Sequence, residues 1–181
     1  MKKLVIALLV LGVPMVLLGA RAQEKTKRGG PTKAVAVVRG FGEHPVKGII
    51  HFTATENGVE IRGELSGLKP GKHGFHIHEF GDVSSDDPKC HGGHFNPEKQ
   101  KHGAPDAAER HIGDLGNITA DGRGKAEISM KDKLIELSGP HSIIGRAVII
   151  HEKADDFTQP VGNAGGRIAG GVVGISDPKH K

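Results

Sequence analysis

Tryptophan and tyrosine are absent from the 181 residues, and the chain has only six phenylalanines. Cysteine occurs once, at Cys90, so an intramolecular disulfide is excluded. Basic stripes interleaved with aromatic residues are also missing, which argues against a nucleic-acid partner. Glycine and histidine are instead abundant, with 28 and 12 residues. Many glycines favour short strands joined by turns, and many histidines in a small chain suggest metal binding.

The amino-terminal segment has the layout of a secretory signal peptide. Residues 1–22 begin with two lysines after the methionine, continue in an apolar run and end in the sequence Ala-Arg-Ala. A membrane anchor is the alternative, but the run is short for a span of about 20 residues and is interrupted by Gly12 and Pro14. We therefore expect cleavage before Gln23, a secreted or periplasmic protein, and no membrane attachment after cleavage.

The remaining 159 residues (181 − 22) fit one domain with a core of ordinary size. Its charge is almost balanced, because the first 22 residues contain three of the 25 basic residues and none of the 21 acidic ones, which leaves 22 against 21. Residues 23–32 are polar and basic, which predicts a disordered arm. The domain itself is expected at 33–176, followed by a polar tail at 177–181.

Runs rich in β-branched residues, many of them alternating, predict eight short strands: 33–40, 48–55, 59–65, 73–79, 114–119, 125–130, 147–151 and 167–175. Asn57-Gly58 is the strongest of the hairpin signals between them. No helical periodicity follows the signal segment. The pattern predicts an all-β fold, an eight-stranded antiparallel Greek-key sandwich or barrel. Two stretches without strand character, 80–113 and 152–166, are long enough that we expect them to be functional loops.

Three histidines are placed by the predicted strands. His76 and His78 are two residues apart on one strand, so their side chains point to the same face. His151 ends another strand. Three imidazoles from rigid strands suit copper or zinc. A His-x-His pair alone is weak, however, because such pairs are often polar surface residues.

A second set lies in and just after the long loop. His94, His102, His111 and Asp114 follow the spacing H-x7-H-x8-H-x2-D. Three nitrogens and one carboxylate oxygen suit a four-coordinate zinc ion, and bound metal can order a loop that lacks apolar residues. From spacing alone, a solvated histidine-rich loop is an equal alternative.

Four blocks of sequence resemble the copper/zinc superoxide dismutase family: 74–82 (GFHIHEFGD), 93–97 (GHFNP), 110–117 (RHIGDLGN) and 162–167 (GNAGGR). The resemblance extends from about residue 33 to 175. It implies conversion of superoxide to dioxygen and hydrogen peroxide by a cycling copper ion, beside a zinc ion joined to it through a histidine. A secreted copper/zinc-binding module without turnover is the alternative on the same fold.

The same resemblance implies roles for individual residues. The copper ligands would be His76, His78, His94 and His151. The zinc ligands would be His94, His102, His111 and Asp114, with His94 bridging the two metals and carrying a proton in the reaction. Asp155 would hydrogen-bond two ligands from behind, and Arg167 would hold the superoxide anion. Because a metal carrier needs neither this arginine nor a bridge, these residues favour catalysis. A homodimer is also implied, with Gly145 and Ile175 at the contact.

The chain departs from the family in three places. The family's disulfide between the metal loop and the last strand is absent, because Gly170 occupies the strand position and Cys90 is displaced toward His94. His91 has no role in the family pattern, and we expect a solvated Cys90-His91 pair. The loop 152–166 is shorter than in eukaryotic members and lacks their substrate-steering charges.

Overall fold

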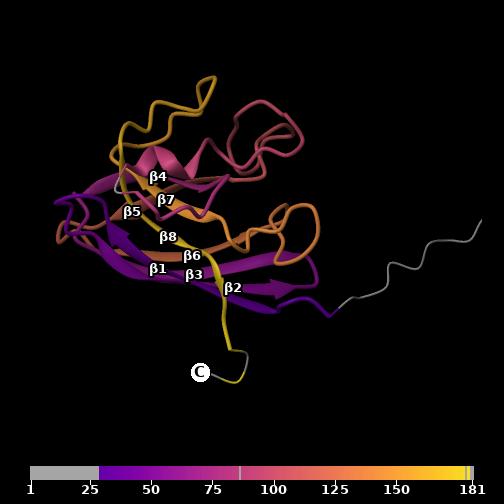
Figure 1. The fold of residues 1–181 in the computed structure, drawn as a ribbon. Helices are drawn as coiled ribbons and strands as arrows, with labels where there is room; N and C mark the ends of the chain where they lie inside the picture. Colours follow the sequence, from indigo (N-terminus) through magenta and orange to yellow (C-terminus); the bar gives the residue numbers. More distant parts are fainter. Residues whose placement is uncertain (1–28, 86, 178, 180–181) are drawn as a thin grey trace, which may run out of the picture.

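The computed structural model describes residues 29–85, 87–177 and 179. Its regular elements are β1 (Lys33–Gly40), β2 (Lys47–Thr55), β3 (Gly58–Ser66), β4 (Gly71–His78), the short 3-10 helix η1 (Pro88–His91), β5 (Asp114–Ala120), β6 (Ala126–Asp132), β7 (Ala147–His151), β8 (Arg167–Val172) and β9 (Gly174–Ile175). Figure 1 shows them as a flattened barrel with the two long loops at one end. No helix in the described part of the chain has the length and hydropathy needed to cross a membrane. The signal segment lies outside the described residues.

Every strand pairs with its neighbours in antiparallel orientation, in the order β5-β4-β7-β8-β1-β2-β3-β6. The first and last strands of this order also approach each other, so that the barrel is almost closed. The barrel has two halves, β5-β4-β7-β8 and β1-β2-β3-β6. They are joined by β8 and β1, which pair over only two residue pairs, Arg39 with Gly170 and Gly40 with Ala169. The all-β prediction is confirmed, and the predicted bounds differ from the observed ones by at most two residues for the first seven strands.

The last predicted strand is divided. β8 ends at Val172, where it pairs with β7, and the two residues of β9 pair with β1 instead, Ile175 lying opposite Ala34. Val173 between them is fully buried and its backbone bonds to Gly145 and Arg146. The chain therefore changes partner at this residue, which an alternating pattern cannot indicate.

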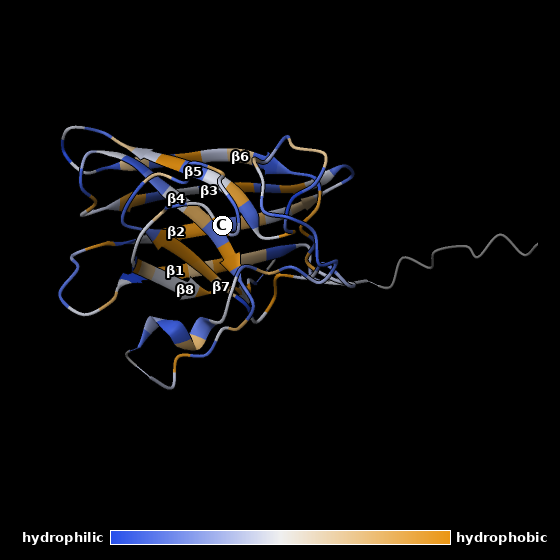
Figure 2. Ribbon diagram, turned by 90° about the horizontal axis from the view of Figure 1, so that it is seen from above, coloured by the Kyte–Doolittle hydropathy of each residue, from blue (hydrophilic) through white to orange (hydrophobic). Residues whose placement is uncertain are grey.

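The core lies between the two halves and follows the strand alternation (Figure 2). On β2, for example, Ile50 and Phe52 are completely buried, whereas His51 between them is exposed and the preceding Ile49 is 47% exposed. This is the pattern of a sheet with one face in the core and the other in solvent.

β4 is the exception, because all of its residues from 73 to 78 are buried. Phe75 and Ile77 point into the apolar core. The opposite face, which carries His76 and His78, is covered because the two long loops fold back onto it and bond to its backbone: Gly74 donates to Lys153, and Phe95 donates to Ile77. The His-x-His pair is therefore interior rather than a polar surface pair.

Candidate metal centre

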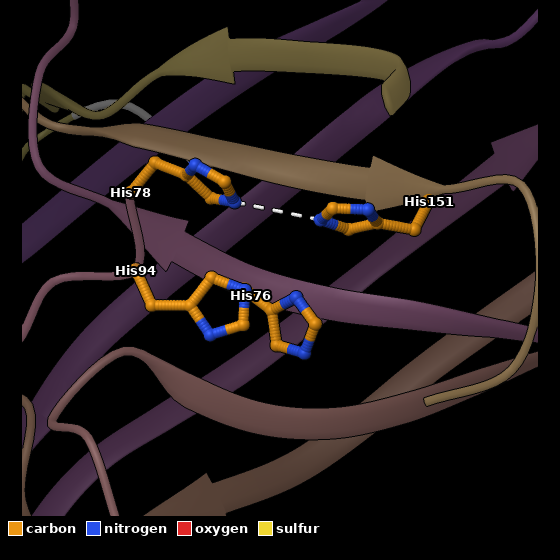
Figure 3. Close-up of side chains that lie close together, drawn as sticks. All are labelled: His76, His78, His94 and His151. Atoms are coloured by element: carbon orange, nitrogen blue, oxygen red, sulfur yellow. Dashed lines mark hydrogen bonds between the residues drawn. The ribbon is translucent and has the colours of Figure 1, made fainter. Parts of the chain in front are cut away.

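Four buried histidines, His76, His78, His94 and His151, form the first cluster, with one ring nitrogen of each within 4.8 Å of those of the others. β4 supplies two of them, and its hydrogen-bonded neighbour β7 ends at the third. His94 comes from the loop, where it forms an isolated bridge with His78. Figure 3 shows the four rings facing one another.

Backbone carbonyls fix the protons on two of these rings. Nδ1 of His78 donates to the Gly92 carbonyl at 3.1 Å, and Nδ1 of His151 donates to the Gly165 carbonyl at 3.2 Å. Since a neutral imidazole carries one proton, both Nε2 atoms present lone pairs, and these two atoms lie 3.4 Å apart. Burial lowers the pKa of His151 to about 3 and that of His78 well below its ordinary value, so both rings stay neutral. Two lone pairs held face to face suit a metal cation.

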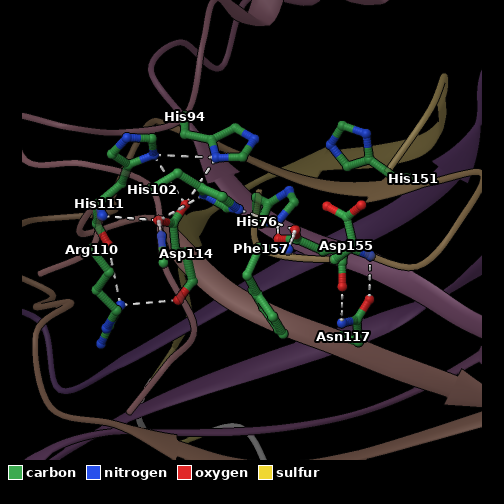
Figure 4. Close-up of polar contacts among 12 residues, drawn as sticks. His76, His94, His102, Arg110, His111, Asp114, Asn117, His151, Asp155 and Phe157 are labelled. Carbon is green, nitrogen blue, oxygen red and sulfur yellow. Dashed lines mark hydrogen bonds and ion pairs between the residues drawn. The ribbon is translucent and has the colours of Figure 1, made fainter. Parts of the chain in front are cut away.

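The second cluster consists of His94, His102, His111 and Asp114, all buried. Asp114 is the first residue of β5, and its carboxylate lies at the centre of this second cluster. Its Oδ1 is 2.8 Å from Nδ1 of His94 and 3.1 Å from Nδ1 of His111, and its Oδ2 is 3.0 Å from Nδ1 of His102. The Nδ1 atoms of His94 and His111 are 3.4 Å apart. Figure 4 shows the three rings gathered around this carboxylate.

The two clusters are joined twice. His94 belongs to both, with Nδ1 directed to Asp114, which leaves Nε2 for the first cluster. Asp155 makes the other link, since its Oδ2 accepts from Nε2 of His76 at 2.8 Å and its Oδ1 accepts from Nε2 of His102 at 3.1 Å. Although burial opposes it, these two hydrogen bonds hold the pKa of Asp155 well below its usual range, so that it is a carboxylate.

Asp155 also determines which ring nitrogens remain for a ligand. Because it occupies Nε2 of His76 and of His102, Nδ1 of each ring is left buried without a well-formed hydrogen bond. A buried nitrogen in this state is costly unless something else binds it. Nitrogen donors from both clusters, with one carboxylate oxygen in the second, fit copper and zinc.

Arg167, the first residue of β8, lies beside the first cluster and is partly buried. Its Nη1 donates to the Pro88 carbonyl and its Nη2 donates to the Gly92 carbonyl at 2.6 Å. Its charge is near enough to contribute to the lowered pKa values of His78 and His151. The structure thus brings together all nine side chains that the sequence analysis singled out for the site.

Three supporting residues were not predicted. The side chain of Asn117 forms a reciprocal pair of hydrogen bonds with the backbone of Asp155, at 2.7 and 2.9 Å. The side chain of Gln159 does the same for His102, and the ring of Phe157 stacks on the ring of His102 with centroids 6.4 Å apart. Asn117 lay within a block that resembled the family, but no pattern pointed to the two loop residues.

The expectation for His91 was wrong. Rather than a solvated side chain, it is only 3% exposed, because η1 turns its ring inward against Phe41. Cys90 is partly exposed and free, and its thiol donates to the Asp82 carbonyl at 2.9 Å.

Comparison with known proteins is consistent across sequence and structure. The family model for copper/zinc superoxide dismutase (SODC) matches residues 46–173. Superoxide dismutase [Cu-Zn] 2 of Mesembryanthemum crystallinum is 46% identical over 156 residues, which cover 81% of this chain and 97% of the plant protein. Superoxide dismutase [Cu-Zn] A of Xenopus laevis is 47% identical over 151 residues, with coverage of 79% and 97%.

Among solved structures, that of the clock protein EA4 superposes with a TM-score of 0.76 at 47% identity, and the match covers 81% of this chain and 96% of that one. Both the fold and the paired clusters agree with these matches. The chain therefore belongs to the copper/zinc superoxide dismutase family, and it is an oxidoreductase that uses copper and zinc to convert superoxide into dioxygen and hydrogen peroxide.

Proposed function

We propose a specific division of the ligands between the two metals. Copper is bound by His76, His78, His94 and His151. Zinc is bound by His94, His102, His111 and Asp114. The observation that carries this assignment is the position of His94, the one residue common to both clusters, with one ring nitrogen directed to each. The second cluster includes a carboxylate oxygen, which zinc accepts as a ligand, and the first cluster offers nitrogen atoms alone, which suit copper.

Copper, when bound, supplies reversible one-electron exchange with superoxide, and zinc supplies positive charge without changing its oxidation state. The chain's own residues then determine orientation and protons. His94 has Nδ1 held by Asp114, so Nε2 is the atom that can hold a proton and pass it to the peroxide product. Asp155 fixes the ring orientation of one ligand in each cluster and so keeps the two sets in register.

Arg167 is the residue that attracts and holds the substrate anion. Its guanidinium is permanently charged and planar, and two carbonyl acceptors fix it at the edge of the first cluster. The donors not used by those carbonyls remain for superoxide. A fixed charge beside the reacting atoms stabilises an anion without reorganisation at the moment of reaction.

Metal analysis and superoxide consumption on the same purified protein test this assignment. We expect copper and zinc in equal amounts, and a rate that falls on the order of 10-fold or more in Arg167→Ala with metal content unchanged. His94→Ala should lose both the bridge and most of the activity. Arg39→Ala, which removes an exposed arginine, is the matched control. Equal rates for wild type and Arg167→Ala would remove the docking role, and normal metal content without turnover would favour the non-catalytic module.

We also propose that the protein is exported and free of the membrane after residues 1–22 are removed. The basic start, the apolar run and the Ala-Arg-Ala end support this. Expression of the full chain in a bacterium, followed by mass spectrometry of the extracytoplasmic fraction, should give a product that begins at Gln23. A full-length product that stays with the membrane fraction would contradict the proposal.

A homodimer is the assembly we propose. Two large apolar side chains, Phe80 and Ile175, are 55% and 66% exposed on the monomer, and the backbone next to Phe80 packs closely on Gly145. Sedimentation equilibrium should give twice the monomer mass for the wild type and the monomer mass for Ile175→Asp. Val83→Asp, at another exposed apolar position, should remain dimeric; a monomeric wild type would refute the proposal.

A further inference from the structure

Phe41 and His91 make a contact that has no part in binding metal. Their ring centroids are 5.4 Å apart at an interplanar angle of 38°. Phe41 directly follows β1, and its backbone N–H donates to the Ile168 carbonyl of β8 at 2.9 Å. His91 is the last residue of η1, in the loop above. The pair therefore joins the barrel to the long loop without a covalent bond.

Gly170 of β8 makes room for this contact. A Cβ atom at residue 170 would lie 2.8 Å from Cζ of Phe41 and 2.8 Å from Cδ1 of Ile149, closer than real Cβ atoms approach their neighbours. Any larger residue would displace the Phe41 ring. Gly170 occupies the strand position of the family's disulfide cysteine. The space that a side chain would take there is filled by the ring of Phe41, the residue that follows β1.

The contact reaches Arg167 through two carbonyl groups. Nδ1 of His91 donates to the Pro88 carbonyl at 2.9 Å, and the same carbonyl accepts from Nη1 of Arg167. The next residue, Gly92, presents the carbonyl that accepts from Nη2 of Arg167 and also from Nδ1 of His78. His91 is therefore hydrogen-bonded to one of the two acceptor carbonyls and adjacent in sequence to the residue that carries the other.

We propose that Phe41 and His91 are positioning residues: Phe41 packs over Gly170, His91 packs on Phe41, and this contact holds the carbonyls of Pro88 and Gly92, which in turn hold the guanidinium of Arg167 at the substrate entrance. The effect on turnover rests on the proposed docking role of Arg167, whereas the effect on the guanidinium itself does not. In this chain, which has a single cysteine, the contact performs the anchoring that a disulfide between loop and strand would otherwise provide.

The test measures how freely Arg167 moves. Copper- and zinc-loaded protein is treated with phenylglyoxal, which modifies arginine, and the rate at each arginine is followed by peptide mass spectrometry. Phe41→Ala and His91→Ala should raise the rate at Arg167 about fivefold, roughly the factor that corresponds to one lost hydrogen bond. Arg39, which is exposed, calibrates the reagent, and Arg110, which is 4% exposed, reports any opening of the whole fold.

Three variants separate the contributions. His91→Phe keeps the ring contact but cannot donate to Pro88, so it should give an intermediate rate. Phe41→Leu retains apolar volume and should fold even if Phe41→Ala does not, with a smaller increase at Arg167. Val83→Ala, an exposed change in the same loop, should have no effect.

An unchanged rate at Arg167 in both alanine variants would overturn the inference, as would an equal rise at Arg110, because that would mean general loosening. Superoxide consumption distinguishes the failure of this inference from failure of the docking role. If Arg167→Ala is fully active while Phe41→Ala still exposes Arg167, the docking role is wrong and the positioning stands. If Arg167→Ala is inactive but the modification rate of Arg167 is unchanged in Phe41→Ala and His91→Ala, only the positioning is wrong.

Discussion

The side-chain amide of Gln159 makes two hydrogen bonds to the backbone of His102, one donated to the His102 carbonyl at 2.7 Å and one accepted from the His102 N–H at 3.2 Å. This pair of hydrogen bonds, the Gln159 clasp, joins the shorter loop, residues 152–166, to the longer loop, residues 80–113. It fixes the peptide that carries one of the proposed zinc ligands.

Gln159→Ala should therefore weaken zinc binding, about 10-fold, because loss of a residue that orients a metal ligand typically costs 10–100-fold in affinity. Competition against a chromogenic chelator on the copper-free protein measures the dissociation constant. Val161→Ala, a nearby exposed change, is the control and should leave the constant unaltered. If both variants bind zinc like the wild type, the clasp does not influence the ligand.

Asp155→Asn should weaken both metal sites. An amide has one acceptor oxygen, so it cannot accept from His76 and His102 together, and one ring is left free to rotate. The expected loss is about 10-fold or more in zinc affinity, with copper retained less completely than in the wild type. The same change at the neighbouring residue, Asp156→Asn, is a strict comparison, because Asp156 is exposed and bonds only within its own loop. Similar metal content in the two variants would contradict the linking role.

The metal-free protein should lose stability in mild acid. Burial lowers the pKa of His94 from 6.5 to about 4, although Asp114 partly opposes it, and burial together with His76 lowers that of His151 to about 3. Below pH 6.5 the unfolded chain takes up protons that these folded rings do not, so stability decreases as pH falls from about 6.5 toward 4. Urea denaturation across this range should show the decrease, and His151→Gln should make it shallower. A flat curve would contradict the prediction.

His102 acts in the opposite direction. Burial alone would lower its pKa, but Asp114 and Asp155 outweigh burial and raise the pKa of His102 to about 9. The stabilisation from its protonated form is fully present below pH 6.5 and is lost as pH rises through about 9. The stability of the metal-free protein should consequently be greatest near about pH 6.5, where the loss toward acid ends and the loss toward pH 9 begins. Zinc competes with the same proton, so zinc binding near pH 7.5 should release protons, which calorimetry in buffers of different ionisation enthalpy can count.

A buried ion pair, Arg110 with Asp132, links the long loop of residues 80–113 to the barrel. Arg110, 4% exposed, pairs with Asp132 of β6 and donates to the backbone carbonyls of His111 and Asp114. Arg110→Met should destabilise the metal-free protein by roughly 3–5 kcal/mol, because a buried carboxylate loses its partner. Chemical denaturation gives this value, with the exposed Arg123→Met as control. A change of less than about 1 kcal/mol would mean that water compensates for the lost arginine.

Periodicity was sufficient for most of the barrel. Alternation on β1 to β3 and the Asn57-Gly58 turn determine which faces are buried, and the structure agrees with them. The metal residues are a different case. Spacing alone left His76 and His78 open to a surface interpretation, since their burial depends on loops that fold over β4. The family blocks, not the spacing, identified the whole set.

The missed residues share a physical cause. Gln159, Phe157 and His91 make contacts between segments that are far apart in sequence, through loops with no repeat. Such contacts depend on how the loops pack in three dimensions. A Cys90-His91 pair in a polar stretch has the composition of a solvated segment, yet His91 is buried and packs against Phe41, 50 residues earlier in the sequence.

The origin of the proposed ligands also bears on how the metal centre could be rebuilt in another protein. His76, His78 and His151 are carried by two adjacent antiparallel strands, a geometry that many unrelated sheets offer, and a designer could reproduce it by choosing three positions. His102 and His111 owe their places to a long irregular segment and the clasps around it. Grafting the three strand histidines onto a new scaffold is a matter of substitutions, whereas His94, His102 and His111 would have to be transplanted with the whole long loop and the loop that packs beside it.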